Sequence, residues 1–268
     1  MRKFPLLALL CFLSLGLAAQ VPYSAPRSET ALLGVESIQD IDQLMVYVEG
    51  IGSPSREALE RQNIKAYMMP VRQATDTRME WAYALTSALE YYININQNYK
   101  DNLSPDLISL SLAAQGNRPN LEDGLAFLRD AGTVSAAIVP YGSPTIPTAV
   151  YSVPRHRIAN FGYLFRPTTR TRNRIFEVRK ALSRGNPVIV ELATDADFNN
   201  YRTAEYSAGV NPVETHYLLV VGYDETTEQF ELRGCKGRHW ANSGYVNISY
   251  EEFGRISRNA YVLFPVPQ

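Results

Sequence analysis

Residues 80–92 read EWAYALTSALEYY, and the apolar side chains in this stretch recur every three or four positions. This is the spacing of one face of an α-helix, so the sequence predicts a long helix with one buried side. Two shorter helices are predicted after it. One opens at Ser104-Pro105, a capping residue followed by proline at the first helical position, and the other runs from Asn120 to Gly132.

Beyond the helices, a loop-rich zone with five prolines between residues 140 and 167 leads to one more predicted helix over residues 174–184. The pattern then changes to runs of β-branched and aromatic residues bounded by turn residues, which predict strands. These runs cover residues 187–192, 216–222, 229–232, 244–248 and 260–264. Helices first and strands afterwards predict an α+β fold with two lobes.

The N-terminal residues indicate a cleavable signal peptide. Residues 1–19 have a charged start, a short apolar run and small residues at the end, so we expect cleavage after Ala19 and a secreted or periplasmic protein. The mature chain then retains one cysteine, Cys235, which has no partner for an internal disulfide.

Residues 20–65 are assigned to a short arm that precedes the main domain, residues 66–268. Within the arm, residues 38–48 have helical spacing. We expect this helix to be docked permanently, with Ile41, Leu44, Met45 and Val48 buried against a lobe.

Composition and charge narrow the range of partners. The chain has 268 residues, is 46% hydrophobic and 20% charged, and carries a net charge of −1, which excludes disordered, collagen-like and coiled-coil classes. Nucleic acid is not expected as a partner because no basic helix or RNA-binding pattern stands out. No later apolar run approaches the length of a membrane span. The histidines have no metal-ligand spacing, so neither a metal nor another cofactor is expected. The sequence carries no indication of the oligomeric state.

Several short strings occur in order between Pro70 and Phe264. They are PVRQ (70–73) with WAYA (81–84), LSPDL (103–107), VPY (139–141), GNPV (185–188), HYLLVVGY (216–223) and GRHWANSGY (237–245). In this order they resemble strings of the papain-like cysteine peptidases. The resemblance implies a papain-like two-lobed fold, with a helical N-terminal lobe and an antiparallel, β-barrel-like C-terminal lobe.

The resemblance also identifies the candidate catalytic positions, and most of them differ from the family pattern. His216 matches the family's catalytic histidine. Glu80 replaces the nucleophilic cysteine, and Gly234 replaces the asparagine that orients the histidine. Gln73 is the candidate for the oxyanion-hole glutamine, although the family's spacing points to Ala74. Since a carboxylate is a far weaker nucleophile toward an amide than a thiolate, these replacements predict an inactive site.

Glu80 has two alternative interpretations, and Cys235 offers an alternative to it as the nucleophile. Thr77-Arg78-Met79-Glu80 fits the capping-box pattern, in which Glu80 folds back onto the amide of Thr77. Alternatively, the carboxylate of Glu80 takes the place of the thiolate and pairs with His216 across the cleft. Cys235, the last thiol, is the alternative nucleophile, but it lacks the helix N-terminus that lowers the pKa of a catalytic thiol.

The predicted function is therefore that of a secreted papain-fold pseudo-peptidase, a binding or scaffolding protein that holds a peptide or protein partner in the former cleft. An active cysteine-type peptidase with a non-standard site is the first alternative. A structural component of the cell surface is the second.

Overall fold

The helix predicted at residues 80–92 is present as α3 (Glu80–Asn96), and its apolar side chains lie in the main hydrophobic core. The structure is a computed structural model that describes residues 34–114 and 118–266. The predicted signal peptide and the first part of the arm, up to residue 33, lie outside these residues.

The predicted helix starts after α3 are confirmed by their caps. The side chain of Ser104 accepts a hydrogen bond from the amide of Leu107, and Asn120 forms a reciprocal capping box with Asp123. Such caps satisfy backbone donors that have no partner within the helix. The other helices are α1 (Ile38–Leu44), α2 (Arg56–Glu60), α4 (Pro105–Ala113), α5 (Leu121–Asp130), α6 (Thr171–Ser183) and α7 (Tyr250–Ile256).

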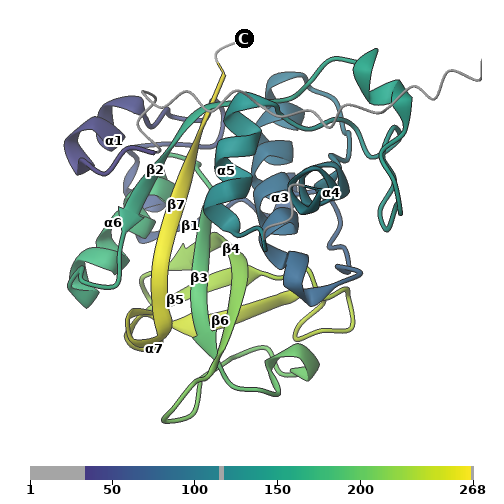
Figure 1. Cartoon of the computed structure of the whole chain (residues 1–268). Helices are drawn as coiled ribbons and strands as arrows, with labels where there is room; N and C mark the ends of the chain where they lie inside the picture. Colours follow the sequence, from purple (N-terminus) through teal and green to yellow (C-terminus); the bar gives the residue numbers. More distant parts are fainter. Residues whose placement is uncertain (1–33, 115–117, 267–268) are drawn as a thin grey trace, which may run out of the picture.

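The strands form one antiparallel sheet with the order β2-β7-β3-β4-β5-β6, and β1 pairs with β4 beside this path (Figure 1). The sheet stays open, since its end strands β2 and β6 are not paired with each other. The α+β class is thus confirmed. The strands are β1 (Arg61–Asn63), β2 (Ile158–Phe165), β3 (Val188–Thr194), β4 (Glu214–Asp224), β5 (Gln229–Arg233), β6 (Tyr245–Ser249) and β7 (Ser257–Pro265).

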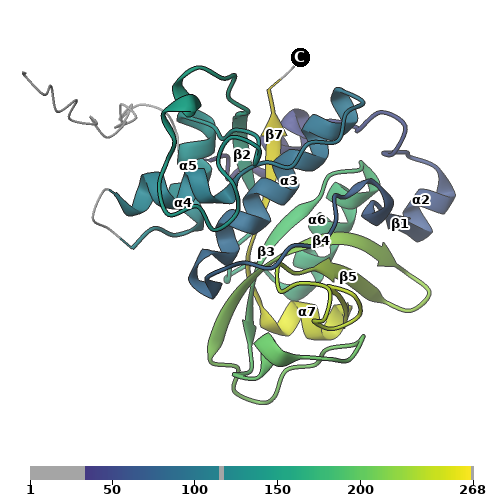
Figure 2. The same ribbon diagram turned by 90° about the vertical axis from the view of Figure 1, so that its right-hand side faces the viewer.

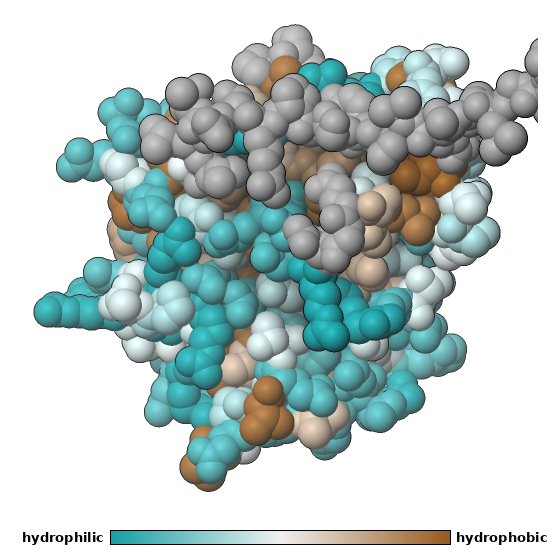
Figure 3. All heavy atoms as spheres, in the orientation of Figure 1, coloured by the Kyte–Doolittle hydropathy of each residue, from teal (hydrophilic) through white to brown (hydrophobic). Residues whose placement is uncertain are grey.

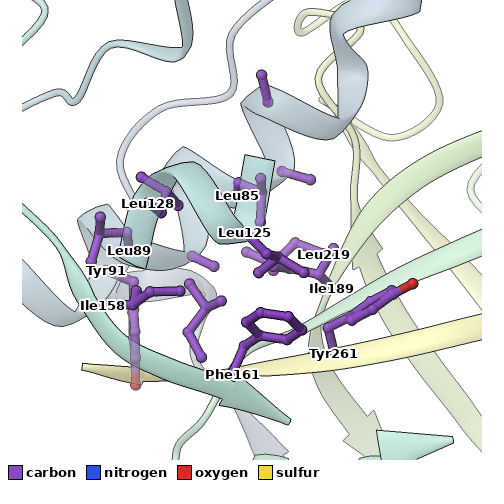
Figure 4. Packing of buried hydrophobic residues seen from close by; sticks show 14 of the residues in the cluster. Leu85, Leu89, Tyr91, Leu125, Leu128, Ile158, Phe161, Ile189, Leu219 and Tyr261 are labelled. Atoms are coloured by element: carbon purple, nitrogen blue, oxygen red, sulfur yellow. The ribbon is translucent and has the colours of Figure 1, made fainter. Parts of the chain in front are cut away.

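Helices α3, α4 and α5 gather on one side of the sheet, away from α6 and α7 (Figures 1 and 2). Leu85 of α3 and Leu125 of α5 point toward Phe161 of β2 and Tyr261 of β7, so helices and sheet share a core (Figure 4). A second cluster packs α6 and α7 against the other face of the sheet. Burial of this apolar surface is the main force that holds the helices on the sheet.

Four helices and strands were not predicted from the sequence: α2, β1, β2 and α7. The supposed loop zone contains β2, and α7 follows β6 directly. β2 reads IANFGYLF, and its glycine at 162 lies where the arm crosses the sheet: a Cβ at Gly162 would lie 2.8 Å from Cγ1 of Ile41. The strand accommodates the arm because this position has no side chain.

The described part of the arm is docked as expected, with one correction. Ile41, Met45 and Val48 are buried, but Leu44 is 46% exposed, so its predicted burial is wrong. The helix α1 ends at Leu44, earlier than the predicted residue 48, and Met45 after it has an extended backbone. Met45 and Val48 are therefore buried although they lie outside the helix, so helical spacing is not the reason for their burial.

The face in Figure 3 is mainly hydrophilic, and its visible apolar residues form small separate groups. Within residues 34–114 and 118–266, no helix has the length and apolar character needed to cross a membrane.

Candidate functional site

The first residue of α3, Glu80, is buried, with 2% of its surface exposed. A short 3-10 turn, η2 (Thr77–Met79), precedes it and is capped by Asp76, whose side chain accepts from the amide of Arg78. The carboxylate of Glu80 is turned away from this turn and toward the sheet. The capping box of Thr77 and Glu80 is therefore not formed, because Asp76 caps the turn and both oxygens of Glu80 bond elsewhere.

The structure brings Glu80 and His216 together. His216 lies near the start of β4, and its Nδ1 is 2.7 Å from Oε2 of Glu80. Burial alone would raise the pKa of Glu80, but the hydrogen bond with His216 and the charges of Lys236 and His216 outweigh burial and lower the pKa. An ionised carboxylate only accepts, so Nδ1 carries the proton in this contact. Nε2 faces Oε2 of Glu214 at 3.2 Å.

Lys236 is a third member of this cluster, and sequence reasoning missed it. Its ammonium donates to Oε1 of Glu80 and to Oδ1 of Asn199, the latter at 2.7 Å, and lies 3.1 Å from Nδ1 of His216. The side chain is only 7% exposed. We name Glu80, His216 and Lys236 the buried triad. The one signal in the sequence was the place of Lys236, next to Cys235 on a segment expected near His216.

Aromatic residues close the triad off from solvent. The ring of Phe198, in the turn η4 (Phe198–Asn200), lies 5.0 Å from the ring of His216. Trp240 packs edge-on against Phe198 and donates from its indole nitrogen to the Phe198 carbonyl at 2.7 Å. Because a low-polarity surrounding strengthens electrostatic interactions, these rings increase the attraction within the triad.

The indole of Trp240 also occupies the space beside Gly234. A Cβ at Gly234 would lie 2.8 Å from Cζ3 of that ring, closer than real contacts allow. No side chain therefore extends from position 234 toward His216, and a larger residue there would displace Trp240.

Gln73 lies beside the segment that carries Lys236. Residues 73 and 236 form an antiparallel bridge, and the side-chain oxygen of Gln73 would lie 3.2 Å from a Cβ at Gly237. Gln73 is exposed, and the neighbouring amide of Ala74 donates to the carbonyl of Cys235 at 2.7 Å. The structure thus brings Gln73 and Ala74 next to the segment of Cys235 and Lys236.

The side chain of Cys235 is buried. Burial, and next the negative charge of Glu80, raise the pKa of its thiol to about 12. It lines a cavity of about 10 Å³ together with Tyr83 and Tyr217, too small for a peptide. At neutral pH this group is a thiol, and the thiolate that nucleophilic attack needs is not formed. Within the described residues, no group of His, Cys, Asp or Glu side chains is arranged to hold a metal ion.

Acid is expected to destabilise the protein through Glu80. Since its pKa in the folded protein lies below the ordinary value of 4.5, its charge contributes stability above that value, and the contribution is lost as the pH falls through the folded value. Thermal unfolding at pH 6, 5, 4 and 3 should show a steeper loss of Tm for the wild type than for Glu80→Gln. Parallel curves would contradict this assignment.

Comparison with known proteins identifies the family. Residues 56–266 match the group described as papain family cysteine protease. A Dictyostelium discoideum protein, Gamete and mating-type specific protein A, is 27% identical over 212 residues, which cover 73% of this chain. The chain spans 44% of the length of that relative.

Solved structures of this family share the fold. Xylellain, a cysteine protease from Xylella fastidiosa, superposes with a TM-score of 0.63 at 17% identity, covering 87% of this chain and 96% of its own. The bromelain protease from Ananas comosus, in complex with the E64 inhibitor, gives 0.61 at 18% identity, covering 77% and 99%. The match over residues 56–266, together with this fold, means that the chain belongs to the papain family of cysteine proteases.

Proposed function

We propose that this chain is a catalytically inactive papain-family protein that is secreted or periplasmic and binds a peptide or protein partner. The observation that carries the proposal is the buried triad. The residue at the position of the family's nucleophile, Glu80, has both carboxylate oxygens engaged, one by His216 and the other by Lys236.

The chemistry of the triad and of its neighbour Gly234 supports the absence of catalysis. A carboxylate is a weak nucleophile toward an amide, and this one is stabilised further in its charged form by two donors. The histidine that would accept a proton from a thiol already donates from Nδ1 to Glu80. Gly234, at the position of the family's orienting asparagine, has no side chain, and the other ring nitrogen of His216 faces Glu214 instead.

An active peptidase with Cys235 as nucleophile is the second candidate, and its thiol geometry argues against it. The side chain is buried among Tyr83 and Tyr217, and its pKa is raised rather than lowered. A cysteine nucleophile needs exposure and a positively charged surrounding that favours the thiolate.

Binding remains the function that the fold supports once catalysis is set aside. The bromelain structure that this chain resembles holds the E64 inhibitor, so that protein accommodates a ligand. We propose that the former cleft of this chain likewise binds a ligand but does not cleave it. The apolar run at the N-terminus supports export from the cytoplasm.

The purified protein is expected to hydrolyse no fluorogenic peptide amide above a buffer blank, because no thiolate is available. A thiol-reactive peptide epoxide should leave the mass of the folded protein unchanged for the same reason. Cys235→Ser is the control variant, since it removes the last thiol of the mature chain. Turnover or labelling that disappears in Cys235→Ser would establish the active-peptidase alternative instead.

A further inference from the structure

A groove on the protein surface lies apart from the buried triad. It is a groove of about 580 Å³ beside the segment that leads from β1 to α3, on the face that Figure 2 turns toward the viewer. We name it the 68–71 groove. None of its lining residues belongs to the triad. The lining residues are Met68, Met69, Pro70, Val71, Lys100, Arg238, Ser243 and Tyr245.

Residues 68–71 form the apolar part of the lining, and their backbone is held in place by hydrogen bonds. Met68, Met69 and Val71 are half-buried, so each leaves part of its apolar surface open to the groove. The guanidinium of Arg233 donates to the carbonyls of Met69 at 2.5 Å and Pro70 at 3.0 Å. The backbone is therefore fixed, while the methionine side chains can adapt to the shape of what they contact.

The groove carries two positively charged side chains that are not tied up in ion pairs within the part of the chain that the structure describes. Lys100 and Arg238 are both exposed, and no carboxylate is among the described residues that line the groove. Within the described chain, neither cation forms an ion pair with Asp or Glu. The adjacent carboxylate of Asp101 accepts a hydrogen bond from Ser135 at 2.9 Å instead.

Charged side chains below the surface add to the positive charge of the groove. Two buried guanidinium groups, those of Arg72 and Arg233, share the single carboxylate of Glu90, which Arg72 contacts directly. Arginine keeps its charge inside proteins, so one positive charge is left over close to the groove. A low-polarity interior transmits this charge farther than water would.

From these observations we propose that the 68–71 groove binds an acidic peptide segment of a partner protein, with an apolar side chain seated on Met68, Met69 and Val71. Opposite charges across an interface favour the correct partner and speed its association. The apolar lining favours a peptide over a sulfated polysaccharide, which has no side chain to place there. The inference is independent of the loss of catalysis, since the groove contains no triad residue.

Fluorescence anisotropy with a labelled decapeptide of alternating Glu and Leu tests this proposal. We expect saturable binding that weakens about tenfold or more in Lys100→Glu/Arg238→Glu. Decapeptides of alternating Lys and Leu, or of Glu and Ser, should bind about tenfold less tightly to the wild type, because each lacks one of the two matched properties.

The matched control is Arg170→Glu/Arg172→Glu, which changes the net charge equally at two exposed residues on and beside α6. It should alter the affinity by about twofold at most. The proposal is overturned if no decapeptide binds, or if the two double variants weaken binding equally. It is also overturned if heparin fragments bind more tightly than the Glu-Leu peptide and lose affinity in Lys100→Glu/Arg238→Glu.

Discussion

Replacing Glu80 with glutamine is expected to lower the free energy of unfolding by about 3–5 kcal/mol at pH 7. The carboxylate is buried and accepts from both His216 and Lys236. Glutamine has nearly the same shape but no charge, so it would leave the buried ammonium of Lys236 without a counter-charge. Urea unfolding followed by circular dichroism measures the change.

The surface pair of Glu60 and Arg56 provides the matched control. These side chains are 59% and 92% exposed and lie 2.9 Å apart, so Glu60→Gln should cost at most about 1 kcal/mol. The double variant Glu80→Gln/Lys236→Met should recover part of the loss, since it removes the unpaired charge as well. If Glu80→Gln cost no more than Glu60→Gln, the triad would not hold the two parts of the fold together.

Deleting residues 20–52 is expected to lower Tm by about 10 °C or more. The deletion exposes the surfaces that Ile41, Met45 and Val48 cover, whose burial contributes about 5–9 kcal/mol before chain entropy is subtracted. It also removes the hydrogen bonds from Asn186 to the carbonyl of Val46 at 2.7 Å and from the amide of Val48 to Arg184 at 2.9 Å. Differential scanning calorimetry of the two proteins gives the comparison.

Two point variants separate docking of the arm from an effect of chain length. Ile41→Ala should cost about 2–5 kcal/mol, because Ile41 is fully buried. Leu44→Ala, on the same helix, should cost about 0.5 kcal/mol or less, because Leu44 is exposed. An unchanged Tm after the deletion would mean that the arm is not part of the stable fold. A truncated protein that cuts peptides would replace our proposal with that of a zymogen.

Most of the fold could be predicted because its signals are local. The helical spacing at residues 80–92, the caps at Ser104 and Asn120 and the β-branched runs after residue 187 each depend on neighbours in sequence. β2 was missed because its neighbours, prolines at 154 and 167, indicate loops, while its pairing with β7 depends on residues far along the chain.

The candidate site could be predicted only where a residue occupies a position in a known string. Glu80 and His216 were found in this way, but whether they touch depends on tertiary structure. The local pattern equally fitted a capping box, and Asp76 forms the cap that the pattern assigned to Thr77. Lys236 had only the signal of its place beside Cys235, and Asn199 had none, because a lysine is usually exposed and only the fold turns this one inward.

The position of β7 in the sheet has a consequence for how the chain folds. β7 (Ser257–Pro265) lies between β2 and β3, although both of these strands precede it in sequence. During synthesis, β2 has no neighbouring strand on that side until residues 257–265 have emerged. Pairings between distant residues form slowly, because loop closure has to precede them. Completion of this sheet is therefore expected to be a late event, and until then the edge of β2 is open to pairing with another molecule.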